Sequence, residues 1–160
     1  MKISIVGAGY VGLVTSVGLA LLGHDVICVD SDVKKSEIIG QGKCPISEKD
    51  LDDLLKKVLN SGRFSATTVL ESAVLNSEVT FICVGTPAAA KGGIDLSQIK
   101  AASKQVGTAL QRKGKYHLVV VKSTVVPGTC TEVVLPIIKK SSQKSTIEFG
   151  LCMNPEFLRE

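Results

Sequence analysis

Four short stretches of this 160-residue chain combine residue types that could bind an anionic ligand or move a proton. Residues 7–12 (GAGYVG) place three glycines at a spacing that can hold a pyrophosphate, or that can simply turn a strand tightly into a helix. The other stretches are residues 85–87 (GTP), 122–124 (KST) and 154–160 (NPEFLRE). Each of these alone is typical of a turn. They indicate chemistry only if one fold brings all four together.

The context of the glycine loop favours a dinucleotide site over a plain turn. The preceding KISIV predicts a strand, and a helical pattern starts directly at the loop, as this fingerprint requires. In such a loop Gly7 makes the tight turn, Gly9 lets the backbone approach the pyrophosphate, and Gly12 allows the helix to pack closely on the strand. The N-terminus of the helix then faces the phosphate charge.

Asp30 ends the second predicted strand, at about the 20-residue distance from the loop where dinucleotide-binding folds carry an acid. Its carboxylate can accept hydrogen bonds from both adenosine ribose hydroxyls and would repel a 2′-phosphate. NAD is therefore favoured over NADP, although Lys34 and Lys35 keep NADP open as an alternative. Lys35 could instead approach the adenosine side of the cofactor. The alternative role for Asp30 is a cap of the next helix.

Short apolar runs rich in β-branched residues alternate with amphipathic stretches along the chain. Continuous apolar runs of this kind suit parallel strands that are covered on both faces. The predicted strands are residues 3–6, 26–29, 64–66, 79–84, 118–121 and 147–152. The predicted helices are residues 11–22, 33–39, 67–75 and 96–111, a helix opened by Ser47 and Asp50 before LDDLLKKVL, and a helix with Pro127 in its first turn that runs to about Lys140. The basic stretch 139–145 (KKSSQKS) is interpreted as a solvated loop rather than a binding patch.

This alternation predicts an α/β fold, a Rossmann-type doubly wound parallel sheet that forms a single domain over residues 1–160. In such sheets ligands bind beyond the carboxyl ends of the strands. Each of the four stretches follows a predicted strand. We therefore expect all four at the same end of the sheet.

Composition limits the other classes of function. With 4% aromatic residues, no Trp and a net charge of only +4, the chain does not suit a nucleic-acid surface. Five widely spaced cysteines without a C-x-x-C pair, and two isolated histidines, argue against a metal site. This cysteine pattern suggests a reducing, cytoplasmic compartment, and we expect no membrane span because no apolar run is long enough.

Five segments together resemble a known family: IVGAGYVGL, GHDVICVD, FICVGTP, VVVKSTVVPGT and NPEFLRE. They are similar to the N-terminal, NAD-binding domain of the UDP-glucose/GDP-mannose dehydrogenases, and the resemblance runs over the whole chain. It implies NAD as cofactor and a nucleotide sugar as substrate, whose primary alcohol is oxidised to a carboxylate in two hydride transfers. UDP-glucose, which would give UDP-glucuronate, is the first substrate that we expect, and GDP-mannose is the alternative.

The resemblance also assigns roles to individual residues. Thr124 and Glu156 are expected beside the reacting carbon, where they would position water and assist proton transfer, so they are the predicted catalytic pair. The predicted cofactor-binding residues are Gly7, Gly9, Tyr10, Val11, Gly12, Asp30, Lys35, Val84, Gly85, Thr86, Ser123, Thr124 and Glu160. The predicted substrate-binding residues are Glu156, Phe157, Leu158, Arg159 and Glu160.

The chain departs from the family pattern in two places. Where the family has P-I-x-E-P-G-L, this chain reads PISEKDL, which retains Glu48 and replaces the Pro-Gly turn by Lys49 and Asp50. The family's nucleophilic cysteine belongs to a downstream Gly-rich motif that none of the five cysteines matches. We therefore expect a chain that is inactive alone, as part of a longer enzyme that the resemblance implies to be a homo-oligomer.

Two other interpretations are a stand-alone NAD-binding module without catalysis and a different Rossmann dehydrogenase, such as a hydroxy-acid type. The second would not explain KST and NPEFLRE together.

Overall fold

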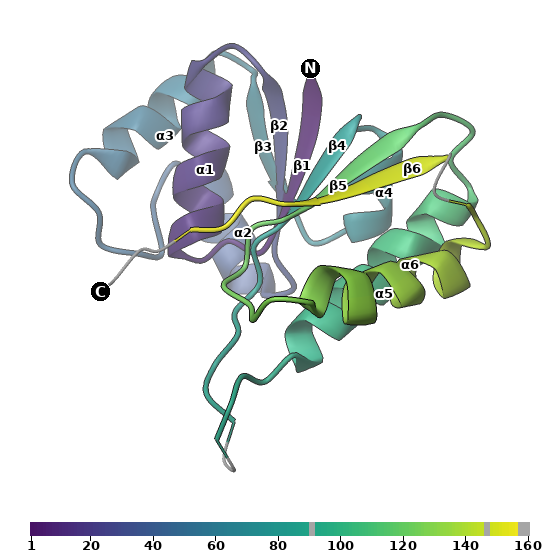
Figure 1. Ribbon diagram of the computed structural model, residues 1–160. Coiled ribbons are helices and arrows are strands. Elements are labelled where there is room, and N and C mark those ends of the chain that lie inside the picture. The colour runs from purple at the N-terminus through teal and green to yellow at the C-terminus, as the bar shows by residue number, and fades with distance from the viewer. Residues whose placement is uncertain (90–91, 146–147, 157–160) are drawn as a thin grey trace.

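The computed structural model contains a six-stranded, wholly parallel sheet with helices on both faces (Figure 1). The strand order is β3-β2-β1-β4-β5-β6, so the chain returns to the centre of the sheet after β3 and then continues outward on the other side. This is the order of the doubly wound dinucleotide-binding fold. The prediction of a single α/β domain with a Rossmann-type sheet is confirmed.

The structure describes residues 1–89, 92–145 and 148–156. The strands are β1 (Lys2–Val6), β2 (Asp25–Val29), β3 (Phe64–Thr67), β4 (Val79–Ile82), β5 (His117–Val121) and β6 (Phe149–Met153). The helices are α1 (Tyr10–Leu21), α2 (Val33–Gly40), α3 (Leu51–Asn60), α4 (Leu70–Leu75), α5 (Ser97–Gln111), the π-helical turn η1 (Cys130–Val134) and α6 (Leu135–Ser142). Ile147, where the last strand was expected to begin, lies outside the described residues.

Each face of the sheet has its own apolar core, because helices cover both faces. On one face, Leu13 of α1 and Leu55 of α3 belong to the same buried cluster as Ile5 of β1. On the other face, Ile99 of α5 and Ile138 of α6 belong to a second cluster. All five side chains are fully buried, and burying an aliphatic side chain of this size contributes about 1.5–3 kcal/mol.

The helix after β5 begins later than the sequence predicts. Pro127 lies in a turn with Gly128, and the helix starts at Thr129, continues through η1 and ends as α6. Pro136 explains the wide π-helical turn, because it has no N–H for the preceding turn and its ring crowds the carbonyl four residues back. Since α6 extends to Ser142, the interpretation of residues 139–145 as a loop is wrong for its first four residues.

The predicted start is also wrong for two other helices. The helix expected from residue 67 begins at Leu70, because Thr67 still belongs to β3. Ser47 does not open α3, which begins at Leu51. The residue before it, Asp50, has φ +61°, and its side chain makes no capping hydrogen bond. Asp50 occupies the glycine position of the family pattern, and it adopts the left-handed conformation that glycine favours.

A hydrogen-bonded polar cluster lies inside the domain near the amino end of β4 and β5. The Thr80 hydroxyl is 2.8 Å from Nε2 of His117 and 2.6 Å from the Ser4 hydroxyl, which is 2.9 Å from the Ser77 hydroxyl. His117 is fully buried, and its Nδ1 has no hydrogen-bond partner among the described residues. Burial, together with the nearby Lys113 charge, lowers the pKa of His117 to about 4.

Lys113 is itself buried and closes the end of α4. Its ammonium donates to the carbonyls of Val74 and Leu75 in the last turn of that helix, and to the carbonyl of Ser77 just beyond it. A cation at a helix C-terminus is favourable because unpaired carbonyls and the helix dipole are negative there. Lys113 thus joins the segment that follows α5 to the end of α4.

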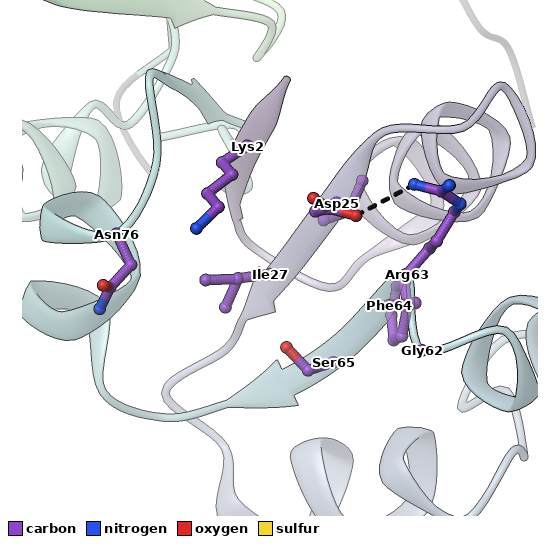
Figure 2. Close-up of a pocket in the computed structure, with 9 residues that line it drawn as sticks. Lys2, Asp25, Ile27, Gly62, Arg63, Phe64, Ser65 and Asn76 are labelled. Atoms are coloured by element: carbon purple, nitrogen blue, oxygen red, sulfur yellow. Dashed lines mark hydrogen bonds and ion pairs between the residues drawn. The ribbon is translucent and has the colours of Figure 1, made fainter.

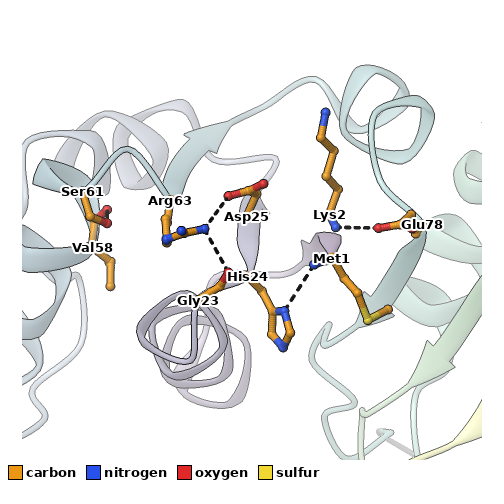
Figure 3. A network of polar contacts seen from close by, with 9 residues as sticks. All are labelled: Met1, Lys2, Gly23, His24, Asp25, Val58, Ser61, Arg63 and Glu78. Atoms are coloured by element: carbon orange, nitrogen blue, oxygen red, sulfur yellow. Dashed lines mark hydrogen bonds and ion pairs between the residues drawn. The ribbon is translucent and has the colours of Figure 1, made fainter.

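The amino end of the sheet carries surface charges around a small cavity. A cavity of about 230 Å³ lies beside β2 and β3, and Lys2, Ile27, Ser65 and Asn76 are among the residues around it (Figure 2). Arg63 donates to the Gly23 carbonyl and to Asp25 at 2.9 and 3.2 Å (Figure 3). These side chains are exposed, so their ion pair contributes little to stability.

Replacing Asp50 should show that the backbone conformation at this position, and not the carboxylate, determines how a substitution changes the stability of the domain. Because Asp50 has φ +61° and no cap bond, Asp50→Gly should be more stable than Asp50→Ala by about 1 kcal/mol, the reverse of the order expected within a helix. Urea unfolding of the two variants measures this difference. Equal stabilities, or a more stable alanine variant, would contradict the proposed conformational cause.

The buried His117 should make the domain less stable in mild acid. The pKa of His117 is about 4 in the folded chain and about 6.5 when unfolded, so only the unfolded state takes up the proton between these values. Between pH 7 and pH 4.5 this should cost about 2 kcal/mol of unfolding free energy. Urea unfolding at several pH values should show a shallower loss for His117→Gln, and His24→Gln, which leaves His117 in place, is the control. Equal slopes for all three proteins would disprove this linkage.

Candidate functional site

The glycine loop leads from β1 into α1 at the carboxyl end of the sheet, where all six strands finish. Gly7 has φ +104°, and a Cβ there would lie 2.6 Å from the carbonyl oxygen of Cys83. A Cβ on Gly12 would lie 1.8 Å from the carbonyl oxygen of Gly7. A Cβ on Gly9 would meet nothing within 4 Å in the described part of the chain. Gly7 and Gly12 therefore allow close packing, and the backbone at Gly9 faces open space.

The first turn of α1 presents backbone N–H groups without a side-chain cap. Gly9 is the N-cap residue, and no capping side-chain bond and no acidic residue occur in the first turn of this described helix. Such N–H groups need water or a ligand as acceptor, and the positive end of the helix dipole favours an anion. This helix end therefore has the properties of a phosphate site.

Asp30 joins the end of β2 to the glycine loop. Its Oδ2 accepts a hydrogen bond from the Ala8 amide at 2.8 Å, and its Oδ1 accepts one from the Asp32 amide at 3.0 Å. The Lys35 ammonium lies 3.9 Å from Oδ2, in a partly exposed ion pair. The cap of α2 is Asp32, which accepts hydrogen bonds from the Lys34 and Lys35 amides. The alternative role of Asp30 as the helix cap is therefore wrong.

A cleft of about 600 Å³ opens beside this loop, a volume typical of small-molecule sites. The predicted residues that line it are Gly7, Gly9, Asp30, Lys35, Val84 and Gly85. The lining residues that the sequence analysis missed are Val6, Val29, Ser31, Asp32, Thr68, Leu70, Cys83, Gln98, Ala101, Ala102 and Gln105. The rule that ligands bind beyond strand ends could have indicated Thr68, which follows β3, although no glycine or proline motif marks that strand.

Thr124 and Glu156 meet beyond the ends of β5 and β6. The Thr124 hydroxyl donates to Oε1 of Glu156 at 2.6 Å, a short bond typical of a charged acceptor. The Thr86 hydroxyl donates to the Thr124 carbonyl at 2.7 Å, so the segment after β4 holds the same strand end. Ser123 is buried, and its hydroxyl donates to the Val84 carbonyl at 2.6 Å. The structure therefore brings the predicted catalytic pair together.

Other predicted site residues lie outside the cleft. Tyr10 is exposed, and its hydroxyl donates to the Ser47 carbonyl at 3.3 Å. Val11 packs against the core on the α1 face. The predictions for Phe157, Leu158, Arg159 and Glu160 concern residues outside those that the structure describes.

Four of the five cysteines have a thiol whose pKa is raised by burial. Burial raises the pKa of Cys28 to about 11 and that of Cys83 to about 12, so both thiols are neutral at physiological pH. Burial also raises the pKa of Cys44, to about 12, and that of Cys130.

Within residues 1–89, 92–145 and 148–156, no group of three or more acidic, histidine or cysteine side chains could hold a metal ion. None of the described helices is long and apolar enough to cross a membrane.

Comparison with known proteins assigns the whole chain to one family. The profile of the UDP-glucose/GDP-mannose dehydrogenase family, NAD binding domain, matches residues 1–160. The chain is 48% identical over 161 residues to the GDP-mannose 6-dehydrogenase of Pseudomonas aeruginosa, covering 100% of this chain and 37% of that protein. The chain belongs to this family.

Other members of the family are similar to this domain in sequence identity and in fold. A UDP-glucose 6-dehydrogenase of Rhizobium meliloti is 44% identical, with 100% of this chain and 36% of that protein covered. The crystal structure of a ternary complex of the P. aeruginosa GDP-mannose dehydrogenase has a TM-score of 0.97, again at 48% identity, 100% coverage of this chain and 37% of that chain. A UDP-glucose dehydrogenase from the archaeon Pyrobaculum islandicum has a TM-score of 0.94 at 43% identity, covering 99% and 36%. The domain spans only about 37% of the length of its P. aeruginosa relative.

NAD is the cofactor of this dehydrogenase domain, and the carboxyl end of the sheet fits it. The uncapped first turn of α1 and the open backbone at Gly9 would hold the pyrophosphate. Asp30 lines the same cleft, where its carboxylate would accept hydrogen bonds from the adenosine ribose.

Asp30→Asn should weaken NAD binding by about tenfold, because a ribose hydroxyl loses a charged acceptor. It should also reduce the preference for NAD over NADP, because the carboxylate no longer repels the 2′-phosphate. Calorimetric titration of the chain with each cofactor measures both effects. Asp25→Asn removes the same charge at the amino end of β2 and should change neither. Unchanged NAD affinity in Asp30→Asn would refute the assigned role.

Proposed function

We propose that this domain holds NAD for the oxidation of a nucleotide sugar, with Thr124 and Glu156 beside the alcohol that reacts. The observation that carries the proposal is the 2.6 Å hydrogen bond between these two side chains, at the end of the sheet that also holds the glycine loop. Family membership supports the reaction class. A stand-alone NAD-binding module would have no need for this pair.

The proton transfers are assigned to the chain's own residues. In the short hydrogen bond the Thr124 hydroxyl donates to Oε1 of Glu156 and so holds this carboxyl group in place. A carboxylate held in this way can take up a proton from an alcohol or a water. NAD, when bound, supplies the acceptor for the hydride. Thr86 fixes the backbone of Thr124 and so keeps its hydroxyl aimed at Glu156.

The second oxidation of the proposed reaction needs an activated nucleophile, and we assign none among the described residues 1–89, 92–145 and 148–156. The neutral, buried Cys28 and Cys83 thiols do not suit this role. Cys152 is exposed on β6, but it is outside any motif of the family's nucleophile. We propose that a segment beyond residues 1–160 supplies the nucleophile and much of the substrate site, and that the chain alone binds NAD without turnover.

GDP-mannose is the substrate that the comparisons favour, in place of UDP-glucose as the first expectation. GDP-mannose 6-dehydrogenases reach 48% identity, against 44% for the UDP-glucose 6-dehydrogenase of R. meliloti. This margin is small, so UDP-glucose is the second candidate.

A chimera tests the function directly. This chain would replace the matching 161-residue segment of the P. aeruginosa GDP-mannose 6-dehydrogenase, and NADH formation would be followed with GDP-mannose and with UDP-glucose. Turnover supports the proposed function. A chimera that binds NAD and has the parent's oligomeric state, yet forms no NADH with either sugar, would contradict it in favour of a binding module.

In an active chimera, Glu156→Gln should lower kcat by about a hundredfold, because the amide cannot accept the proton. NAD affinity should stay within about twofold, since Glu156 is outside the lining of the cofactor cleft. Glu132→Gln makes the same change on the exposed side of η1 and should leave kcat unaltered. Unchanged turnover in Glu156→Gln would remove its catalytic role.

A further inference from the structure

The bond between Thr124 and Glu156 depends on the alignment of β5 with β6, but the backbone ladder stops before it. The two strands pair from His117 with Phe149 to Val121 with Met153. The last backbone hydrogen bond runs from the Asn154 amide to the Val121 carbonyl at 2.9 Å. The next amide that could extend this ladder, that of Ser123, donates instead to the Ile82 carbonyl at 3.1 Å. Beyond this point the bonds between the two strand ends that the described residues show are made by side chains.

One side-chain bond lies between the end of the ladder and the catalytic pair. The Lys122 ammonium donates to Oδ1 of Asn154 at 2.9 Å, and these residues are 32 apart in sequence. Thr124 and Glu156 are also 32 apart, so both pairs continue the register of the ladder. Because side chains alternate along a strand, Lys122 and Thr124 belong to one face of β5's continuation, and Asn154 and Glu156 belong to the same face of β6's continuation.

Because β6 is an edge strand, the contact between Lys122 and Asn154 matters for its alignment with β5. Among the described strands β6 pairs with β5 alone, so no second neighbour fixes its register. A slip of one residue would move every side chain to the opposite face, and a slip of two would place Asn154 or a residue beyond Glu156 opposite Thr124. Either slip would break the hydrogen bond that carries the proposed function.

We propose that Lys122 and Asn154 form a register clamp, a pair of positioning residues that hold Thr124 opposite Glu156. Lys122 directly follows β5, so it lies at the same end of the sheet as the glycine loop. The clamp acts through alignment of two strand ends and not through contact with the cofactor. Its consequence for catalysis rests on the proposed function, whereas the alignment itself can be measured in this chain without turnover.

Hydrogen exchange of the backbone amide of residue 154 tests the alignment directly. Lys122→Met keeps the aliphatic stem and removes the donor, and Asn154→Ala removes the acceptor while retaining the charge of Lys122. Each should speed exchange at this amide by about tenfold, because local opening at the strand end becomes easier. The Leu118 amide, which donates to the Glu78 carbonyl between β4 and β5, should be unaffected and so show that the sheet is intact.

Asn154→Asp retains an acceptor for Lys122 and should keep exchange near that of the unsubstituted chain. Lys139→Met, on the exposed side of α6, is the control for the loss of a lysine. A rise of less than about threefold in both Lys122→Met and Asn154→Ala would overturn the clamp.

The chimera then separates positioning from charge. Lys122→Met and Asn154→Ala should each lower kcat by about tenfold with KM for NAD unchanged, the double variant should lose little more, and Asn154→Asp should restore most of the rate. A loss of kcat in Lys122→Met but not in Asn154→Ala would overturn the clamp, because Lys122 would then act through its charge. If the unsubstituted chimera is inactive, the proposed function fails, and the exchange measurement still decides the clamp.

Discussion

Parallel pairing of all six strands decides where chemistry can occur in this domain, because it brings the end of every strand to the same end of the sheet. The register of the central strands then sets the distances there. Val6 of β1 lies beside Val29 of β2 and Ile82 of β4, so the segments that follow these three residues start from the same level. The glycine loop, Asp30 and the turn after β4 are neighbours for this reason. An antiparallel sheet would divide the same motifs between two ends.

The glycines make this convergence sterically possible. A side chain at Gly7 would collide with the Cys83 carbonyl, and one at Gly12 would collide with the Gly7 carbonyl, so β1, α1 and the end of β4 could not approach one another. Asp30 completes the arrangement because its carboxylate accepts the Ala8 amide of the loop. That carboxylate therefore has two tasks, since it holds the loop and lines the cleft beside it. The same contact orients Asp30 before any cofactor binds, which reduces the ordering that binding requires.

The sequence could predict those parts of the domain that depend on local patterns. Apolar β-branched runs give the strands, their alternation with helices gives the parallel sheet, and the glycine spacing gives the loop. The backbone conformation at the start of α3 could not be predicted, because Asp50 adopts a glycine-like φ that its residue type does not indicate. The cleft residues Gln98 and Gln105 belong to the face of α5 that tertiary packing turns toward the loop, and one sequence does not reveal that choice. Lys122 and Asn154 were missed for a related reason, because their contact depends on the pairing register and not on their spacing along the chain.

The polar groups at the two ends of the sheet differ in where they find hydrogen-bond partners. Near the amino end, the buried Lys113 ammonium and the Ser4 and Thr80 hydroxyls find their partners within the domain. At the carboxyl end, the first turn of α1 is uncapped by any described side chain, and Gly9 faces open space. A bound pyrophosphate would satisfy N–H groups that otherwise rely on water. A ligand that binds only the folded domain also stabilises it, by an amount that grows with the ratio of its concentration to its Kd. The groups that make this end a cofactor site are therefore the groups through which NAD stabilises the fold.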